Sequence, residues 1–192
     1  MIRMARIKIE ISARHVHLNH ADLEKLFGSG YNLKILRELS QKGQFASRER
    51  VIVKTKKGEF PTVRVLGPMR RNTQVEISMT DARKLGIEPP VKRSGNLEGS
   101  VGAFLIGPRG KVKLKNGIII AKRHIHCSDK EAKKYKVKDG EEVSVKVDGE
   151  RSLTFHKVVV RIRKDFSWSM HVDADEGNAA GVTQGAVGEV IR

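Results

Sequence analysis

A short phrase that occurs twice constrains the fold of this chain more than any other sequence feature. Residues 13–17 read Ala-Arg-His-Val-His, and residues 122–126 read Lys-Arg-His-Ile-His. Each phrase follows an apolar run rich in β-branched residues, which predicts that each histidine pair lies at the end of a strand. Side chains two residues apart in a strand leave the same face, so both imidazoles of a pair can bind one metal ion.

Each phrase is followed by the signature of a helix start. Asn19 comes three residues before Asp22, and Ser128 comes three residues before Glu131. A side-chain oxygen at the cap and an acid three positions later satisfy backbone N–H groups of the first helical turn. The two copies therefore form an internal repeat, in which each copy has a strand, a histidine pair and a short helix.

A second pair of segments extends this repeat. Residues 75–87 align with residues 170–182 as strand, cap, short helix and stopping glycine, and the alignment places Glu76 opposite His171. Each half of the chain therefore supplies a histidine pair and a third candidate ligand. The two predicted sets are His15, His17 and Glu76 in the first half, and His124, His126 and His171 in the second.

Both sets are typical of catalytic zinc, in which three protein ligands leave a fourth position open for water or substrate. The third ligand lies far along the chain from its pair, which a barrel can accommodate and a zinc-finger loop cannot. Ligand type alone leaves Ni²⁺, Co²⁺ and Fe²⁺ open. The alternative is that the histidines are solvated or hydrogen-bonded to protein, but the duplication and the matched third residue favour metal binding.

The remaining pattern predicts a mainly β fold with short capping helices. Many short apolar strands alternate with brief helices, which favours small antiparallel β-barrels over a parallel sheet with long crossovers. Together with the repeat, this pattern predicts two small antiparallel β-barrels related by internal duplication. A segment with Pro, Gly, Ser and Asn at residues 89–102 is the best candidate for a joint between the halves.

Composition limits the partners. The chain has 38 Lys plus Arg against 22 Asp plus Glu, a net charge of +16, which favours an anionic partner such as nucleic acid or a phosphate-rich cofactor. A charged surface of the kind found in heat-adapted proteins is the alternative. Aromatic residues make up only 5%, which argues against nucleic-acid binding by base stacking.

No apolar run approaches the roughly 20 residues of a membrane span, so no membrane partner is expected. The single cysteine, Cys127, suits a reducing cytoplasm.

Four arginines have open roles. Arg14 and Arg123 take the same place in both copies and fit either an anion site beside a metal or a structural salt bridge. Arg70 and Arg71 lie in a break just before the strand with Glu76, where a guanidinium can hold phosphate through a bidentate fork. The alternative for these two is a solvated turn.

Six motifs resemble the PduL-type phosphate acyltransferases, the phosphate propanoyltransferase family associated with bacterial microcompartments. They are ISARHVHL at 11–18, GPMR at 67–70, QVEIS at 74–78, SGNLEGS at 94–100, AKRHIH at 121–126 and MHVDADEGN at 170–178. The resemblance covers essentially the whole chain. It implies reversible transfer of an acyl group, acetyl or propanoyl, between coenzyme A and inorganic phosphate, which forms acyl phosphate and free coenzyme A.

The resemblance also implies where the site lies. It implies two zinc ions per chain in one site between two helix-capped β-barrels, held by the two ligand sets that the internal repeat indicates independently. Arg70 is expected to contact phosphate. Coenzyme A is expected to contact Ile11, Ser12, Ala13, Arg64 and Asn178.

The family's organisation further implies that the N-terminal strand completes the second barrel. The expected domains are therefore residues 14–121, and residues 122–192 together with 1–13. A homodimer is expected as well. Microcompartment members have an N-terminal encapsulation helix, whereas this chain begins almost at its first predicted strand, so a free cytoplasmic enzyme is expected.

No serine or cysteine lies beside a base in a way that indicates a covalent acyl-enzyme, so direct attack by phosphate is predicted. Phosphate is already a nucleophile at neutral pH, and zinc and Arg70 would position it and offset charge.

One competing functional class is a metal-dependent hydrolase acting on a related ester or thioester. The other is a basic nucleic-acid-binding protein with a structural metal. Release of coenzyme A with and without phosphate separates these classes.

Overall fold

The computed structural model describes residues 3–183 and 185–191, and its chain divides into two compact units. The barrel unit combines Met1–Ser12 with Lys122–Arg192, and the sheet unit is Ala13–Ala121. Strands dominate both units and the helices are short, which confirms the mainly β prediction. None of the helices in these described ranges has the length and apolar composition that a membrane crossing requires.

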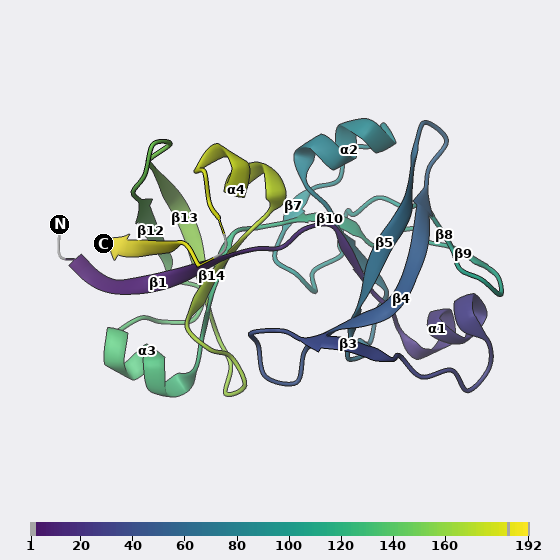
Figure 1. Ribbon diagram of the computed structural model, residues 1–192, viewed down its shortest axis with the longest axis horizontal. Helices are drawn as coiled ribbons and strands as arrows, with labels where there is room; N and C mark the ends of the chain where they lie inside the picture. The colour runs from purple at the N-terminus through teal and green to yellow at the C-terminus, as the bar shows by residue number, and fades with distance from the viewer. Residues whose placement is uncertain (1–2, 184, 192) are drawn as a thin grey trace. The chain divides into compact units, whose positions relative to one another are not determined.

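Six strands of the barrel unit close on themselves. They are β1 (Arg3–Ile11), β11 (His124–Cys127), β12 (Glu142–Val147), β13 (Leu153–Ile162), β14 (Ser169–Val172) and β15 (Val187–Ile191). Their order around the barrel is β1-β14-β11-β13-β12-β15. In Figure 1, β1 and β15 run side by side, so the first and last strands of the chain pair antiparallel.

This barrel is mixed, whereas the predicted barrels were antiparallel. β1 pairs parallel with β14, and β11 pairs parallel with β13. Antiparallel neighbours can be joined by a tight hairpin, but parallel neighbours need a long connection. β1 and β14 are far apart in the sequence, so no hairpin dictates their relative direction.

The barrel encloses an aliphatic core. Alternation in β1 buries Ile7 and Ile9 and leaves Lys8 between them exposed, because successive side chains of a strand face opposite ways. Cys127 lies in this core, and burial, with Glu131 and Asp129 nearby, raises the pKa of its thiol to about 12. The thiol is therefore neutral and shielded at physiological pH.

The sheet unit contains nine strands. They are β2 (His15–His17), β3 (Ile35–Glu38), β4 (Phe45–Lys54), β5 (Glu59–Gly67), β6 (Gln74–Glu76), β7 (Val91–Lys92), β8 (Phe104–Ile106), β9 (Lys111–Lys113) and β10 (Ile118–Ala121). Eight follow the order β7-β10-β6-β2-β5-β4-β8-β9, and β3 pairs with β4. This path is open, so the first half forms a half-barrel sheet where a second closed barrel was expected.

Internal duplication is visible in matched irregularities. In the sheet unit, the β4–β5 register shifts between the pairs Val51–Val63 and Val53–Phe60. In the barrel unit, the β12–β13 register shifts in the same way between Val143–Val158 and Val145–Phe155. An extra residue in one strand bends and twists a pair locally, and such bulges persist within a fold. The shared shift supports descent of both halves from one unit.

The helices begin at fixed places relative to the candidate ligands. They are α1 (His20–Phe27), α2 (Met79–Leu85), α3 (Asp129–Tyr135) and α4 (Ala174–Ala179). Each N-cap side chain accepts a backbone N–H bond and lies two residues after a candidate ligand: Asn19 after His17, Ser78 after Glu76, Ser128 after His126 and Asp173 after His171. Four strand ends thus share one local design.

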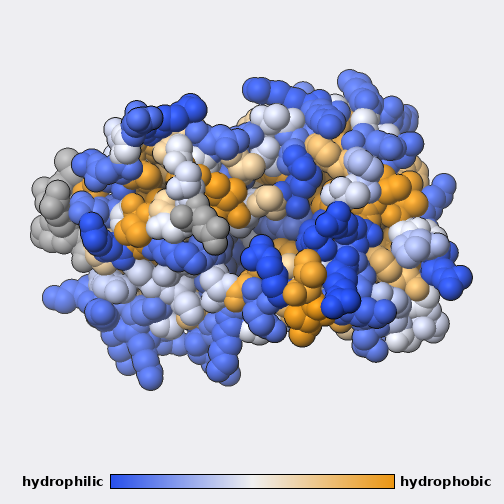
Figure 2. Space-filling model, viewed as in Figure 1, coloured by the Kyte–Doolittle hydropathy of each residue, from blue (hydrophilic) through white to orange (hydrophobic). Residues whose placement is uncertain are grey.

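Figure 2 shows a mostly hydrophilic face with small apolar patches, in keeping with the net charge of +16.

Candidate metal centres and the arginine beside them

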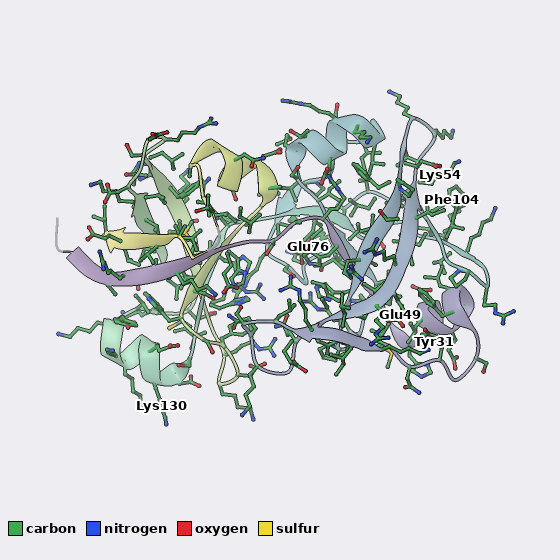
Figure 3. The ribbon with its side chains drawn as sticks, in the orientation of Figure 1. Tyr31, Glu49, Lys54, Glu76, Phe104 and Lys130 are labelled. Atoms are coloured by element: carbon green, nitrogen blue, oxygen red, sulfur yellow. The ribbon has the colours of Figure 1, made fainter. Side chains whose placement is uncertain are left out.

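The first ligand set comes together inside the sheet unit. Strands β2 and β6 pair antiparallel with His15 directly opposite Glu76, and His17 projects from the same strand end. One donor atom from each of His15, His17 and Glu76 lies within 4.8 Å of the others, and all three side chains are buried. His15 Nε2 is 3.6 Å from Glu76 Oε2. Glu76, which is labelled in Figure 3, is among the buried residues of its unit.

Backbone carbonyls orient the imidazoles. The Nδ1 atom of His15 lies 2.9 Å from the Ala13 carbonyl oxygen, and that of His17 lies 3.2 Å from the Leu66 carbonyl oxygen. A carbonyl oxygen only accepts, so each Nδ1 bears the proton and each Nε2 keeps its lone pair. This second contact is the usual way in which a protein fixes the tautomer of a metal-binding histidine.

The charges of this set suit a cation. Burial, together with His15 and Arg70, lowers the pKa of His17 well below its usual value, so its imidazole is neutral at physiological pH. Burial alone raises the pKa of Glu76, but His15, His17, a hydrogen bond from Ser94 and the Arg70 guanidinium outweigh it and lower the pKa to about 2. A neutral imidazole and an ionised carboxylate are the forms that bind a metal.

A hydrogen-bond network holds the outer oxygen of Glu76. Ser94 Oγ donates to Glu76 Oε1 at 2.6 Å, and the Gln74 side-chain amide donates to the same oxygen. The Gly95 N–H donates to Gln74 Oε1 at 2.8 Å and fixes the orientation of that amide. Arg70 Nη1 donates to Ser94 Oγ at 3.1 Å and lies 4.0 Å from Glu76 Oε1. The other oxygen, Oε2, faces His15.

Sequence reasoning missed Gln74 and Ser94. Both lie within the motifs that resemble the family, at 74–78 and 94–100, but no role followed from their residue types. The available signal was the period of a strand, since Gln74 precedes Glu76 by two residues and shares its face.

The second ligand set lies inside the barrel unit. Strands β11 and β14 pair antiparallel with His124 opposite His171, the same relation as His15 opposite Glu76. The ring centroids of His124 and His126 are 4.7 Å apart, and that of His171 lies 5.4 Å from His124 and 4.4 Å from His126. The Nε2 atoms of His124 and His126 are 3.1 Å apart. Two nitrogens bound tetrahedrally to zinc stand about 3.3 Å apart, so this spacing suits one ion.

The second set differs from the first around His171. Its Nε2 lies 3.1 Å from Ser169 Oγ and 3.8 Å from Glu10 Oε2, and its Nδ1 lies 3.5 Å from Ser12 Oγ. Within the part of the chain that the structure describes, the first set is the one group of three whose donor atoms all lie within 4.8 Å. The second set is therefore the looser of the two.

His126 is held by stacking. Its ring lies on Phe166 with centroids 3.8 Å apart, and its buried Nδ1 has no hydrogen-bond partner among the residues that the structure describes. Burial, then His171 and His124, lower the pKa of His126 far below its usual value, so the ring is neutral. His124 is oriented like His15, with Nδ1 2.9 Å from the Lys122 carbonyl oxygen.

The residues expected to contact coenzyme A lie in both units. Ile11, Ser12 and Asn178 belong to the barrel unit, and Ala13 and Arg64 to the sheet unit. A Cβ on Gly177 would come within 2.7 Å of Ile11 Cδ1, so the end of β1 packs against the helix that contains Asn178. Arg64 Nη1 donates to the Ser47 carbonyl at 2.9 Å, which ties this arginine to β4.

Comparisons with known proteins agree on one family. A model of the phosphate propanoyltransferase family matches residues 8–183. The chain is 52% identical over 180 residues to a phosphate propanoyltransferase of Thermotoga maritima, covering 93% of this chain and 86% of that protein. It is 48% identical over 188 residues to the one of Clostridioides difficile, covering 98% and 90%. The predicted resemblance is confirmed, and this chain belongs to the phosphate propanoyltransferase family, whose members are acyltransferases.

Proposed function

We propose that this chain transfers an acetyl or propanoyl group between coenzyme A and inorganic phosphate, in either direction. The observation that carries this proposal is the buried His15–His17–Glu76 cluster with Arg70 linked to it through Ser94. The cluster is suited to a Lewis-acidic ion, and the arginine brings positive charge to its edge. The test is release of coenzyme A from acetyl-CoA and propanoyl-CoA. Release should require phosphate, whereas release that ignores phosphate would indicate a hydrolase.

Two zinc ions per chain are part of the proposal, one at each ligand set. Support comes from the carbonyl-oriented histidines, the neutral buried His17 and His126, and the ionised Glu76. Zinc bound there would supply Lewis-acid stabilisation of a thioester oxygen or a departing thiolate. Elemental analysis of active protein should give two zinc ions per chain, and active protein without a transition metal would refute this part.

The remaining catalysis is assigned to positioning and charge. Arg70 is half-buried next to Glu76, where its guanidinium would hold phosphate and offset negative charge as the phosphate oxygen attacks the thioester carbonyl. A covalent step through Cys127 is not proposed, because its thiol is buried and protonated. Contacts of coenzyme A with Ile11, Ser12, Ala13, Arg64 and Asn178 remain part of the proposal.

A homodimer in the cytoplasm completes the proposal. The buried, protonated Cys127 is compatible with a reducing compartment. Light scattering of the purified chain tests the oligomeric state: a mass of about twice 21.5 kDa supports the dimer, and the monomer mass refutes it.

A further inference from the structure

In both units, an arginine directly before the histidine pair donates to the capping carboxylate of a helix and lies near a phenylalanine ring. In the sheet unit, Arg14 donates through Nε at 3.0 Å and through Nη2 at 2.6 Å to Asp81 Oδ1. Its guanidinium also lies over the ring of Phe60, 4.3 Å from the centroid. Asp81 is buried and closes the capping box of α2 with Ser78.

The barrel unit repeats this arrangement. Arg123 donates through Nη1 to Glu176 Oε1 at 2.8 Å and through Nε to the His156 carbonyl at 2.8 Å. Its guanidinium lies 5.6 Å from the ring centroid of Phe155. Glu176 closes the capping box of α4 with Asp173, as Asp81 does in α2.

These contacts join two segments that must stay in register for a metal site to exist. Arg14 is covalently next to His15, and its partner Asp81 belongs to the helix whose cap follows Glu76 by two residues. The contact therefore ties the start of β2 to the end of β6, where His15 lies opposite Glu76. Arg123 ties the start of β11 to the end of β14, where His124 lies opposite His171.

The contacts also decide between the two roles left open by the sequence. In Arg14 the Nε and Nη2 donors, the edge that forms a bidentate fork, both point at Asp81. An anion at that edge would have to displace a buried carboxylate. The contacts therefore favour a structural salt bridge over an anion-binding site.

We propose that Arg14 and Arg123 are positioning residues, each of which holds the third metal ligand of its own unit in register with the adjacent histidine pair. Each acts through the capping carboxylate of the following helix, Asp81 or Glu176, and touches neither metal nor substrate. The inference rests on the metal sites proposed above. It predicts that loss of either arginine weakens one metal site and leaves the other unchanged.

The test uses full-length chains that retain one site at a time. His126→Ala leaves the sheet-unit site, and His17→Ala leaves the barrel-unit site. In each background, Arg14→Met and Arg123→Met are introduced separately, and the zinc dissociation constant is measured by competition with a chelator. Removal of a residue that orients a metal ligand typically weakens binding about 10- to 100-fold. We expect about a 10-fold loss for Arg14→Met at the sheet-unit site only, and for Arg123→Met at the barrel-unit site only.

Two further sets of variants separate positioning from general stabilisation. Lys54→Met and Lys146→Met remove exposed ion pairs with Glu59 and Asp148, one in each unit, and should leave both dissociation constants unchanged. Asp81→Asn keeps an oxygen for the cap but removes the charge that Arg14 contacts, so it should weaken the same site. Combined with Arg14→Met, it should add little, because both changes break one contact. If Arg14→Met fails to fold, Asp81→Asn gives the same test.

Three outcomes would overturn the inference. The first is unchanged zinc affinity in variants that only melt at a lower temperature, which would make the ion pairs merely structural. The second is an equal loss at both sites from either arginine. The third is a wild-type chain that binds no metal, which would refute the proposed function as well. Two zinc ions in the wild type with unaffected variants would refute this inference alone.

Discussion

At the scale of single residues, the first candidate ligand set holds its side chains in the protonation states that would bind a metal ion. Carbonyl contacts leave the Nε2 lone pairs of His15 and His17 available, and burial keeps His17 neutral. Ser94 and Gln74 occupy one oxygen of Glu76 and leave the other facing His15. A metal ion would therefore bind with little change in the protonation or orientation of these side chains.

Arg70→Ala tests the phosphate contact. Loss of the guanidinium should lower kcat/KM for phosphate on the order of 100-fold, because it removes a preorganised positive charge from the reacting region. Bound zinc should not change. The control is Arg71→Ala, which removes an exposed neighbouring arginine. Kinetics of Arg70→Ala that match the control would count against the assigned role.

Ser94→Ala tests the link between Arg70 and Glu76. The change removes a 2.6 Å hydrogen bond to Glu76 and the acceptor of Arg70 Nη1. Arg70 should then be held less firmly, and KM for phosphate should rise several-fold with zinc retained. Ser100→Ala is a matched control, because Ser100 lies in the same loop and, among the described residues, forms hydrogen bonds with the backbone of Leu97 and Gly117. An unchanged KM would show that Ser94 does not position Arg70.

The buried histidines predict how acid affects the metal-free protein. Burial lowers the folded-state pKa of His17 and His126 below that of the unfolded chain, about 6.5. Below that pH the unfolded state binds protons that the folded state does not, so stability falls as pH falls. Each histidine should cost about 1.4 kcal/mol per pH unit there. Denaturation of the metal-free chain between pH 8 and pH 5 should show little change from these groups above about pH 7 and an approach to this slope below about pH 6.

A substitution identifies the groups responsible for that slope. His126→Gln should reduce the loss of stability between pH 6.5 and pH 5, whereas His20→Gln, at an exposed helix position, should leave it unchanged. A slope that is the same in both variants would mean that His126 is not the group that takes up the proton on unfolding.

At the scale of elements, the recurring motif is a strand with a candidate ligand at its last or next-to-last residue and a helix cap two residues after that ligand. It occurs four times, with caps Asn19, Ser78, Ser128 and Asp173. The cap fixes where the helix starts, and thereby where the strand must end. In each half of the chain, two of these strands pair antiparallel and place a histidine pair opposite the third candidate ligand.

These local signals explain what the sequence could predict. Caps and strand periodicity are short-range, so the histidine pairs and the helix starts followed from them. The partnership of Glu76 with its pair followed from the internal repeat, which aligns Glu76 with His171. Sheet closure is a long-range property, which is why the open sheet and the parallel pairing of β1 with β14 were not foreseen. The roles of Gln74 and Ser94 depend on a contact between segments that are 20 residues apart in the sequence, and no local pattern reports it.

Strand β1 gives a test at this scale. Ile9 is buried in the barrel core, and Ile9→Ala should destabilise the barrel unit by about 3 kcal/mol through lost burial and a cavity. Trp168, the single tryptophan, lies in this unit on the ring of Tyr135, so its fluorescence reports barrel unfolding in denaturant. Lys8→Ala, at the adjacent exposed position, should change stability by less than about 0.5 kcal/mol. Equal effects would mean that β1 does not contribute to the core as described.

At the scale of the whole molecule, charge is the dominant property. The chain has a net charge of +16, and Figure 2 shows hydrophilic residues over much of the visible face. Such a field attracts anions from a distance and is screened over about 8 Å at physiological ionic strength. Both proposed substrates are anionic, so encounter with them should depend on salt more than the chemical step does.

The electrostatic contribution to substrate encounter can be measured separately by changing the charge of the substrate instead of that of the protein. With acetyl-CoA, kcat/KM should fall several-fold between 20 mM and 300 mM sodium chloride, while kcat changes little, because salt screens the long-range attraction. Acetyl-pantetheine has the same thioester without the nucleotide phosphates, so its kcat/KM should fall much less in the same series at saturating phosphate. Parallel declines for both thioesters would place the salt effect at the phosphate site or on the fold. The excess positive charge would then have no part in capturing the coenzyme.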